Sequence, residues 1–204
     1  MMTKTEFAPD ERTRIEDDIR EKYRKVALNP EGLFKYPTGR AGVNALQYND
    51  DLIKTLPESV AAAYCGVGNP FSLGPIHEGE KVLDVGSGAG FDTIIAGMMT
   101  GPEGNVIGID IVPEMIERAN RNLREVSLCN VSFQQASAER LPFPDDSFDV
   151  VISNGVINLI PDKRKALSEV FRVLKSKGRL MIADQVLVGP QPKDSKTRVD
   201  NWSH

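Results

Sequence analysis

Cysteine and histidine are scarce in this 204-residue chain, which has two cysteines, Cys65 and Cys129, and two histidines, His77 and His204. Two cysteines exclude a disulfide framework, and two histidines exclude a histidine-rich metal site, so we expect no bound metal. The apolar runs are only a few residues long, far short of the roughly 18 residues that span a bilayer. The opening residues carry charges throughout, which predicts that they form no secretory signal peptide.

An excess of basic residues is also lacking. Lys and Arg number 25 against 29 Asp and Glu, which leaves a formal net charge of −4. Such a chain has no net positive field to hold a phosphate backbone, so we expect no nucleic-acid partner. Hydrophobic residues make up 40% and charged residues 26%, a globular composition. We therefore expect a cytoplasmic protein of one to two domains that binds neither nucleic acid nor membrane.

Hydrophobic periodicity divides the chain near Gly79. Before it, apolar residues at spacings of three and four predict a helix over 10–28, and two or three short helices follow within 43–65. After it, strands and helices alternate, which is typical of βαβ units in a parallel sheet. We expect strands at 81–85, 105–109, 131–135, 148–153 and 179–183, with helices at 91–100, 113–126 and 162–175 between them.

The segment VLDVGSGAGFD at 82–92 joins the first of these strands to a helix. Glycines at this place let a ligand approach the backbone N–H groups at the helix N-terminus. Asp110 follows 20 residues after Gly90, at the end of the next strand, where a carboxylate can accept hydrogen bonds from ribose hydroxyls. Phe91 breaks the G-x-G-x-x-G pattern of NAD-binding loops. Asp84 would repel a pyrophosphate but could hold the ammonium of a methionine moiety, which favours S-adenosylmethionine.

Residues 66–183 resemble class I S-adenosylmethionine-dependent methyltransferases, most of all the arsenite-methyltransferase-like branch. The matching segments are GVGNP (66–70), VLDVGSGAGFD (82–92), GPEGNVIGID (101–110), PEMIERA (113–119), SNGVINL (153–159) and FRVLKSKGRL (171–180). The resemblance implies a Rossmann-like α/β sheet with strand order 3-2-1-4-5. It also divides the chain into an N-terminal helical extension or lid (1–65), a cofactor-binding methyltransferase domain (66–184) and a polar C-terminal tail (185–204).

The same resemblance assigns the cofactor site. Its implied residues are Asp84, Gly86, Gly88 and Gly90 at the methionine end, Asp110 at the ribose, Ile111 and Met115 beside the adenine, and Ser137, Ala138 and Glu139 at the adenine edge. Core packing of its helix is the alternative interpretation of Met115. The stretch 36–40 is expected either to fold over the cofactor as a lid or to link two helices.

Acceptor-side residues should follow strands four and five, because open α/β sheets bind ligands at the carboxyl ends of their strands. Asn154 and Asn158 offer amide groups there, and Asp184 offers a carboxylate that could act as a base. A loop-capping role for either Asn, and a solvated position for Asp184, are the alternatives. We name these three as candidate catalytic residues.

Thiolates to hold arsenic are lacking, although trivalent arsenic needs several soft ligands. Gly155 and Val67 stand where arsenite-methylating relatives carry cysteine, and Cys65 is the one candidate thiol near the site. The sequence therefore predicts methyl transfer to a small molecule. An arsenite methyltransferase, and an inactive cofactor-binding module that acts through a partner, are the alternatives.

The number of strands raises a further question. Five strands can be placed where the family normally has seven, so the final hairpin is expected to be missing. Either the chain is a truncated form of a longer enzyme, or it has a minimal sheet with an exposed strand-five edge that could pair two copies as a homodimer.

Overall fold

The computed structural model describes residues 7–186, 188–189, 199 and 202. Its first part contains the long helix α1 (Pro9–Leu28) and the short helices α2 (Gly39–Ala45), α3 (Asp50–Ile53) and α4 (Glu58–Ala62). A 3-10 turn, η1 (Pro70–Leu73), leads into the sheet. The N-terminal helix predicted over 10–28 is thus present, and the short helices predicted within 43–65 overlap three observed ones.

The five strands form one parallel sheet in the order β3-β2-β1-β4-β5, as predicted. They are β1 (Lys81–Val85), β2 (Asn105–Asp110), β3 (Val131–Gln135), β4 (Phe148–Asn154) and β5 (Leu174–Ala183). The helices between them are α5 (Phe91–Thr100), α6 (Pro113–Arg124) and α7 (Lys163–Val173), and a 3-10 turn, η2 (Ile157–Leu159), follows β4.

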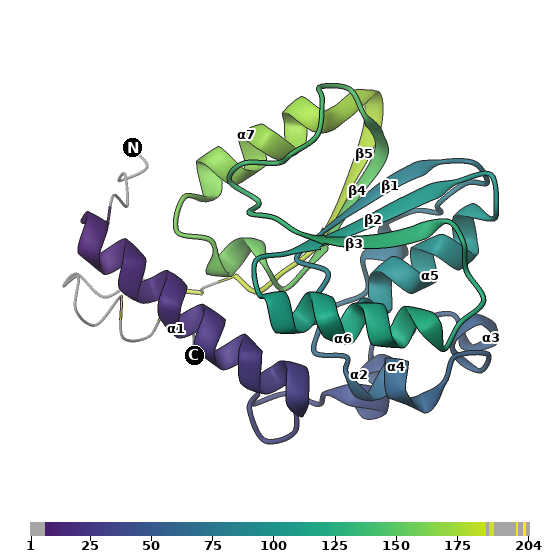
Figure 1. Ribbon diagram of the computed structural model, residues 1–204, viewed down its shortest axis with the longest axis horizontal. Coiled ribbons are helices and arrows are strands. Elements are labelled where there is room, and N and C mark those ends of the chain that lie inside the picture. The colour runs from purple at the N-terminus through teal and green to yellow at the C-terminus, as the bar shows by residue number, and fades with distance from the viewer. Residues whose placement is uncertain (1–6, 187, 190–198, 200–201, 203–204) are drawn as a thin grey trace.

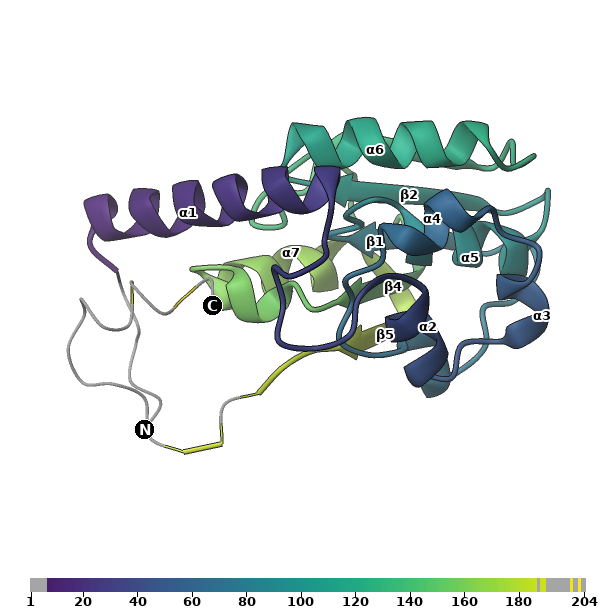
Figure 2. The same ribbon diagram turned by 90° about the horizontal axis from the view of Figure 1, so that it is seen from below.

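Helices cover the sheet on both faces (Figure 1), α5 and α6 on one and α7 on the other. Alternation along β1 explains the two layers, because successive strand side chains point to opposite faces. Val82 packs in a cluster with Ala96 of α5, whereas Leu83 and Val85 pack with Val170 of α7. The C-terminal end of α1 lies against the start of α6 in both ribbon views (Figures 1 and 2), and the rest of α1 extends past the carboxyl ends of the strands.

Strand β5 starts earlier than the sequence predicts. The helix expected over 162–175 ends at Val173, and the strand begins at Leu174 rather than Arg179. Leu174 pairs with Phe148, and the register then shifts before Val150 pairs with Arg179. Lys177 has a left-handed φ of 67° at this irregularity, which lets the chain bend without ending the strand. The local sequence Lys177-Gly178 marks this bulge, not the helix end that we expected.

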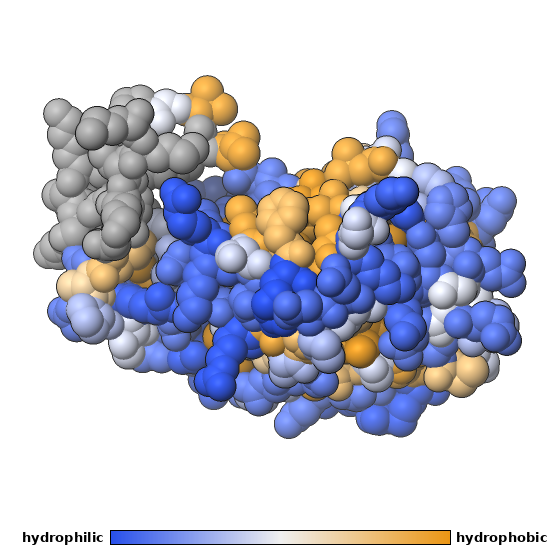
Figure 3. Space-filling model, turned by 90° about the horizontal axis from the view of Figure 1, so that it is seen from above, coloured by the Kyte–Doolittle hydropathy of each residue, from blue (hydrophilic) through white to orange (hydrophobic). Residues whose placement is uncertain are grey.

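The surface seen from the α7 side is mostly hydrophilic, with an apolar patch near its middle (Figure 3). None of the helices in the described part of the chain is long and apolar enough to cross a membrane. Most of the polar tail expected at 185–204 lies outside the described residues. Trp202 is described, and its indole Nε1 donates a hydrogen bond of 2.7 Å to the carbonyl of Leu159.

Candidate functional site

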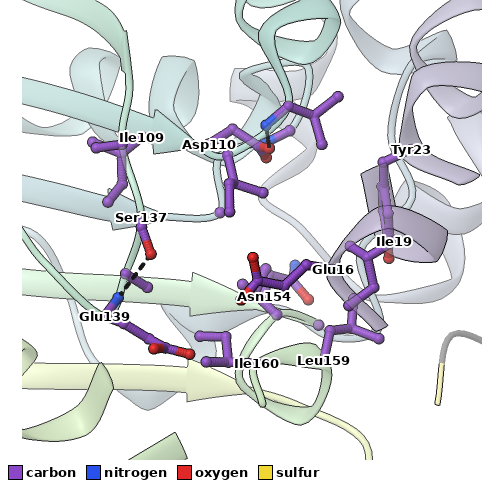
Figure 4. Close-up of a pocket in the computed structure, with 18 of the residues that line it drawn as sticks. Glu16, Ile19, Tyr23, Ile109, Asp110, Ser137, Glu139, Asn154, Leu159 and Ile160 are labelled. Carbon is purple, nitrogen blue, oxygen red and sulfur yellow. Dashed lines mark hydrogen bonds between the residues drawn. The ribbon is translucent and has the colours of Figure 1, made fainter. Parts of the chain in front are cut away.

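A cavity of about 120 Å³ lies at the carboxyl ends of β1, β2 and β4. Figure 4 shows side chains entering it from three directions: Asp110 from β2, Ser137 and Glu139 from the loop after β3, and Glu16, Ile19 and Tyr23 from α1. The lining residues are Glu16, Ile19, Tyr23, Cys65, Gly86, Gly88, Ile109, Asp110, Ile111, Val112, Ala136, Ser137, Ala138, Glu139, Asn154, Gly155, Val156, Leu159, Ile160 and Pro161.

The glycine loop forms one wall of this cavity. Gly86, Gly88 and Gly90 all have left-handed φ values, of 78°, 51° and 90°. The N–H groups of Gly86 and Ser87 each donate a 2.8 Å hydrogen bond to the carbonyl of Ile109, which fixes the loop to β2. A Cβ built on Gly88 would have no atom within 4 Å, so the chain leaves open space there beside the cavity. A ligand can therefore approach the loop backbone closely.

Asp110 connects this loop to the next helix. Its Oδ2 accepts a 2.9 Å hydrogen bond from the N–H of Gly88, and its Oδ1 accepts one of 2.9 Å from Val112. A carboxylate has about four lone-pair sites, so capacity remains for two further donors. Burial raises the pKa of Asp110 to about 6 despite these N–H groups, which lower it. Hydrogen bonds from two hydroxyl groups of a ligand would offset the free-energy cost of burying this carboxylate away from water.

The remaining walls suit a flat apolar group. Ile111, Ala136, Ala138, Ile160 and Pro161 line the cavity beyond Asp110. Ser137 supplies a hydroxyl at the edge, where its Oγ accepts a 3.3 Å hydrogen bond from the N–H of Glu139. Apolar walls with a few convergent polar groups are typical of small-molecule sites. The glycine loop, the Asp110 carboxylate and the apolar walls therefore meet around one cavity.

Three residues predicted at the cofactor lie outside the lining. Met115 is fully buried in a cluster with Val26 of α1, so its observed place is the core packing that we gave as the alternative. Gly90 ends the loop, and a Cβ there would come within 2.6 Å of the Phe133 ring rather than enter the cavity. Asp84 is 2% exposed, beneath the loop, and accepts a 2.6 Å hydrogen bond from Thr93 Oγ1. Its pKa lies well above the usual range because of burial and the charge of Asp92.

Helix α1, within the stretch 1–65 that we expected as an N-terminal extension or lid, forms one side of the cavity. Glu16, Ile19 and Tyr23 line the cavity, and Arg12 forms an ion pair with Glu139 across it. Glu139 also accepts a 3.2 Å hydrogen bond from the N–H of Asp162. None of the residues 36–40 lines this cavity, although the Tyr36 hydroxyl donates a 3.0 Å hydrogen bond to the carbonyl of Cys65, which does. Arg40, in the same stretch, pairs with Glu58 at 2.8 Å, away from the cavity.

A second, larger cavity of about 800 Å³ adjoins the first. Tyr23, Gly155 and Leu159 line both, so they stand between them. The second cavity is lined by Arg14, Asp18, Glu21, Lys22, Tyr23, Lys25, Leu33, Phe34, Lys35, Tyr36, Val67, Gly155, Asn158, Leu159, Gln185 and Trp202. Its place beyond β4 and β5 is where we expected the acceptor.

The side chain of Asn154, at the end of β4, makes several hydrogen bonds. Its Oδ1 accepts from the N–H groups of Val67 at 2.9 Å and Gly68 at 3.1 Å. Its Nδ2 lies 2.8 Å from the carbonyl of Gly68 and 2.9 Å from Oδ2 of Asp92, and donates to both. Tyr48 donates to the other oxygen of Asp92 at 2.7 Å. Asn154 therefore holds the loop 66–68 against the sheet, which makes it a positioning residue.

Asn158 and Asp184 lie together but outside the first cavity. The N–H of Asn158 donates a 3.0 Å hydrogen bond to Asp184 Oδ2, and the N–H of Gln185 donates one of 2.7 Å to Oδ1. Burial raises the pKa of Asp184 nonetheless. Asn158 lines the second cavity, and its buried Oδ1 has no hydrogen-bond partner among the described residues. Asp184 thus fixes the turn that carries Asn158.

The two cysteines lie in different environments. Cys65 lines the first cavity, and burial raises the pKa of its thiol to about 12. Cys129 is exposed, between α6 and β3. Within the described residues no three Cys, His, Asp or Glu side chains gather in a way that could hold a metal ion.

The buried carboxyls predict an unusual pH dependence of stability. Burial raises the pKa of Asp92 to about 6, as it does for Asp110. A carboxyl whose pKa is higher in the folded than in the unfolded state makes folding take up protons, so stability falls as pH rises through the folded pKa. We expect the ligand-free protein to lose about 1 kcal/mol of unfolding free energy per carboxyl between about pH 5 and pH 7.

Denaturant titrations at these two pH values measure that change. Asp92→Asn should flatten the slope, whatever it does to stability at pH 7. Asp149→Asn is the matched control, because Asp149 is paired with Lys175 at 2.7 Å and its pKa is lowered, not raised. A stability that rises from pH 5 to pH 7 would contradict the prediction.

Comparison with known proteins agrees with this geometry. The sequence profile of a family described as "Methyltransferase domain" matches residues 76–203. An arsenite methyltransferase of Halobacterium salinarum is 40% identical over 164 residues, which cover 80% of this chain and 42% of that protein. A ubiquinone/menaquinone biosynthesis C-methyltransferase of Cronobacter sakazakii is 36% identical over 69% of this chain and 61% of its own length.

A solved structure is similar over much of the chain. It is an arsenic(III) S-adenosylmethionine methyltransferase from Chlamydomonas reinhardtii, with a TM-score of 0.60 and 35% identity over 73% of this chain and 50% of that one. This chain thus spans about half, or less, of the length of the arsenite relatives that it matches.

Proposed function

Because this chain belongs to the class I S-adenosylmethionine-dependent methyltransferases, we propose that it transfers a methyl group from S-adenosylmethionine to a small organic molecule. The observation that carries the proposal is the pair of adjoining cavities, one lined by the glycine loop and Asp110 and the other beyond β4 and β5. Methyl transfer is an in-line displacement, so the donor and the acceptor must meet where the two cavities adjoin. The residues that line both cavities there are Tyr23, Gly155 and Leu159.

The residues of the first cavity would bind and orient the cofactor. S-adenosylmethionine, when bound, supplies a methyl group on a positively charged sulfur that is already activated for displacement. Asp110 would accept from the ribose hydroxyls, Gly88 would let the methionine end approach the loop, and Ile111 with Ala138 would flank the adenine. Alignment of two reactants can supply roughly 7–11 kcal/mol of the barrier. The chain's main contributions would therefore be alignment and the exclusion of water by α1.

Calorimetric titration with S-adenosylhomocysteine tests the cofactor part. We expect binding to the wild-type protein, and Asp110→Ala should weaken it by about tenfold or more, since two hydrogen bonds to a charged group are lost. Asp51→Ala is the control, because Asp51 is an exposed carboxylate of α3, in an ion pair with Lys54. Absence of binding to the wild-type protein would refute the proposal. Turnover of any acceptor would dismiss the inactive-module alternative.

An organic acceptor is favoured over arsenite. Several relatives are named as arsenite methyltransferases, but trivalent arsenic needs thiolates. The thiol of Cys65 is held protonated by its raised pKa, and exposed Cys129 lies outside both cavities. Production of methylated arsenic by the wild-type protein, abolished in Cys65→Ser, would reverse this preference.

We also propose that the protein is cytoplasmic and that two copies pair through the edge of β5. The position of β5 at one end of the sheet supports the pairing. An unpaired strand edge offers hydrogen-bonding groups to a second copy. Light scattering of the purified protein measures this association directly.

A further inference from the structure

Among the described residues, three line both cavities, and one of these three carries a polar group on its side chain. Gly155 has no side chain and Leu159 has an apolar one, whereas Tyr23 ends in a hydroxyl. The proposed function places the transferred methyl group where the two cavities adjoin. The Tyr23 hydroxyl is therefore the polar side-chain group that these shared residues bring to the place where the methyl group must pass.

Helix α1 holds the ring of Tyr23 at this boundary. Spacings of three and four residues place Glu16, Ile19 and Tyr23 on one face of α1, and all three line the first cavity. The ring packs against the buried cluster that contains Met115, and its centre lies 6.2 Å from that of the Phe34 ring. These contacts involve the ring and not the hydroxyl, so a phenylalanine at this position can make them as well.

The hydroxyl itself is available to a ligand. Within the described part of the chain it forms no hydrogen bond, whereas the hydroxyl of Tyr36 donates one of 3.0 Å to the carbonyl of Cys65. Figure 4 shows the Tyr23 side chain extending from α1 with its hydroxyl directed to the side of the cavity where Leu159 lies. Burial raises the pKa of Tyr23 well above its usual range, so the group stays protonated at neutral pH. A protonated hydroxyl offers two lone pairs as acceptors.

These lone pairs match the charge of the methyl donor. The positive charge of a sulfonium polarises the C–H bonds of its methyl group, and such a group can donate a weak hydrogen bond to an oxygen atom. The demethylated product has a neutral sulfur and lacks this methyl group. Tyr23 would therefore make the contact with the donor and lose it when the methyl group leaves and the C–S bonding pair stays on sulfur.

We propose that the Tyr23 hydroxyl binds the transferred methyl group through its oxygen and thereby raises the affinity of this chain for the methyl donor relative to the demethylated product. The inference rests on the proposed function, because it takes the first cavity to hold the donor and the second to hold the acceptor. It gives α1 a direct part in recognition of the reacting group, in addition to forming one side of the cavity.

Calorimetric titrations test this contact whatever the acceptor is. The ligands are S-adenosylmethionine, S-adenosylhomocysteine and sinefungin, an analogue in which a carbon bearing an ammonium replaces the methylated sulfonium. Tyr23→Phe removes the hydroxyl and keeps the ring. We expect it to weaken sinefungin binding by about tenfold, because a hydrogen bond from a charged group is lost, and S-adenosylmethionine binding by about threefold. Binding of S-adenosylhomocysteine should stay within about twofold of the wild-type value.

Tyr36→Phe is the matched control, because Tyr36 lines the second cavity and not the first. It should leave the ratios of the three affinities unchanged. Equal weakening of all three ligands by Tyr23→Phe would show a merely structural role, and unchanged binding of all three would show that the contact does not exist, so either result overturns the inference. Binding of S-adenosylhomocysteine by the wild-type protein in the same series leaves the proposed function standing in both cases, whereas its absence removes the proposed function as well.

Discussion

Gly86→Ala should destabilise the protein by about 3 kcal/mol or more, through two independent effects. Gly86 has a φ of 78°, and an L residue in this left-handed region costs roughly 1–2 kcal/mol. A Cβ at this position would also overlap the side chain of Val156, with both γ-methyl groups too close. Overpacking of this kind typically costs 1–3 kcal/mol. Denaturant-induced unfolding measures the sum.

A double-mutant cycle separates the two effects. Val156→Ala removes both γ-methyl groups, although the Cβ of residue 156 stays 2.9 Å from the new Cβ. Gly86→Ala in that background should therefore cost the backbone effect of about 1–2 kcal/mol and only part of the overpacking. Gly88→Ala is the matched control in the same loop. Gly88 has a φ of 51° with no atom within 4 Å of its Cβ position, so stability should fall by only about 1 kcal/mol, while the new methyl group weakens cofactor binding. Equal losses of stability in Gly86→Ala and Gly88→Ala would contradict this account.

The sequence predicted the part of the fold that depends on local pattern. Short apolar runs bounded by turns correctly located β1 and β3, and the alternation with helices gave a parallel sheet. The glycine loop and Asp110 were also predictable, because a strand, a loop and a helix follow one another in sequence and their ligand-facing groups are fixed by that order. Gly86, Gly88 and Asp110 line the first cavity, whereas Gly90 does not.

Long-range contacts were not predictable in this way. The spacing of Ile19 and Tyr23 predicts the apolar stripe of an amphipathic helix. No local sequence pattern indicates that part of this stripe lines a cavity. Met115 has the same kind of ambiguity, and packing against α1 buries it. Asn154 was expected to face the acceptor. Its partner Asp92 is 62 residues away in sequence, so no spacing rule could pair them.

Asn154→Ala is expected to have the second large effect, about 3–5 kcal/mol of unfolding free energy. The substitution leaves the N–H groups of Val67 and Gly68 and one oxygen of Asp92 without their partner. A buried group that loses its hydrogen bond costs roughly 1–3 kcal/mol, and more when it is charged. Amide hydrogen exchange should show the loop 66–68 opening at a lower free energy than in the wild type. Asn120→Ala is the control, since this half-buried Asn makes one hydrogen bond within its own helix.

Asn154→Asp gives the sharper test of why the amide is needed. Aspartate keeps the oxygen that accepts from the N–H groups of Val67 and Gly68. The Nδ2 donor that faces Asp92 becomes an oxygen, so two carboxylates then face one another. Like charges at this distance raise the pKa of the pair, so one proton should be retained and shared between the two groups. The variant should therefore be closest to wild-type stability near pH 5 and fall further behind as pH rises to 7. A deficit that is the same at both pH values would show that Asn154 acts through the loop alone. A deficit that grows with pH would show that its amide also holds the charge of Asp92, and through Asp92 the start of α5 beside the cofactor loop.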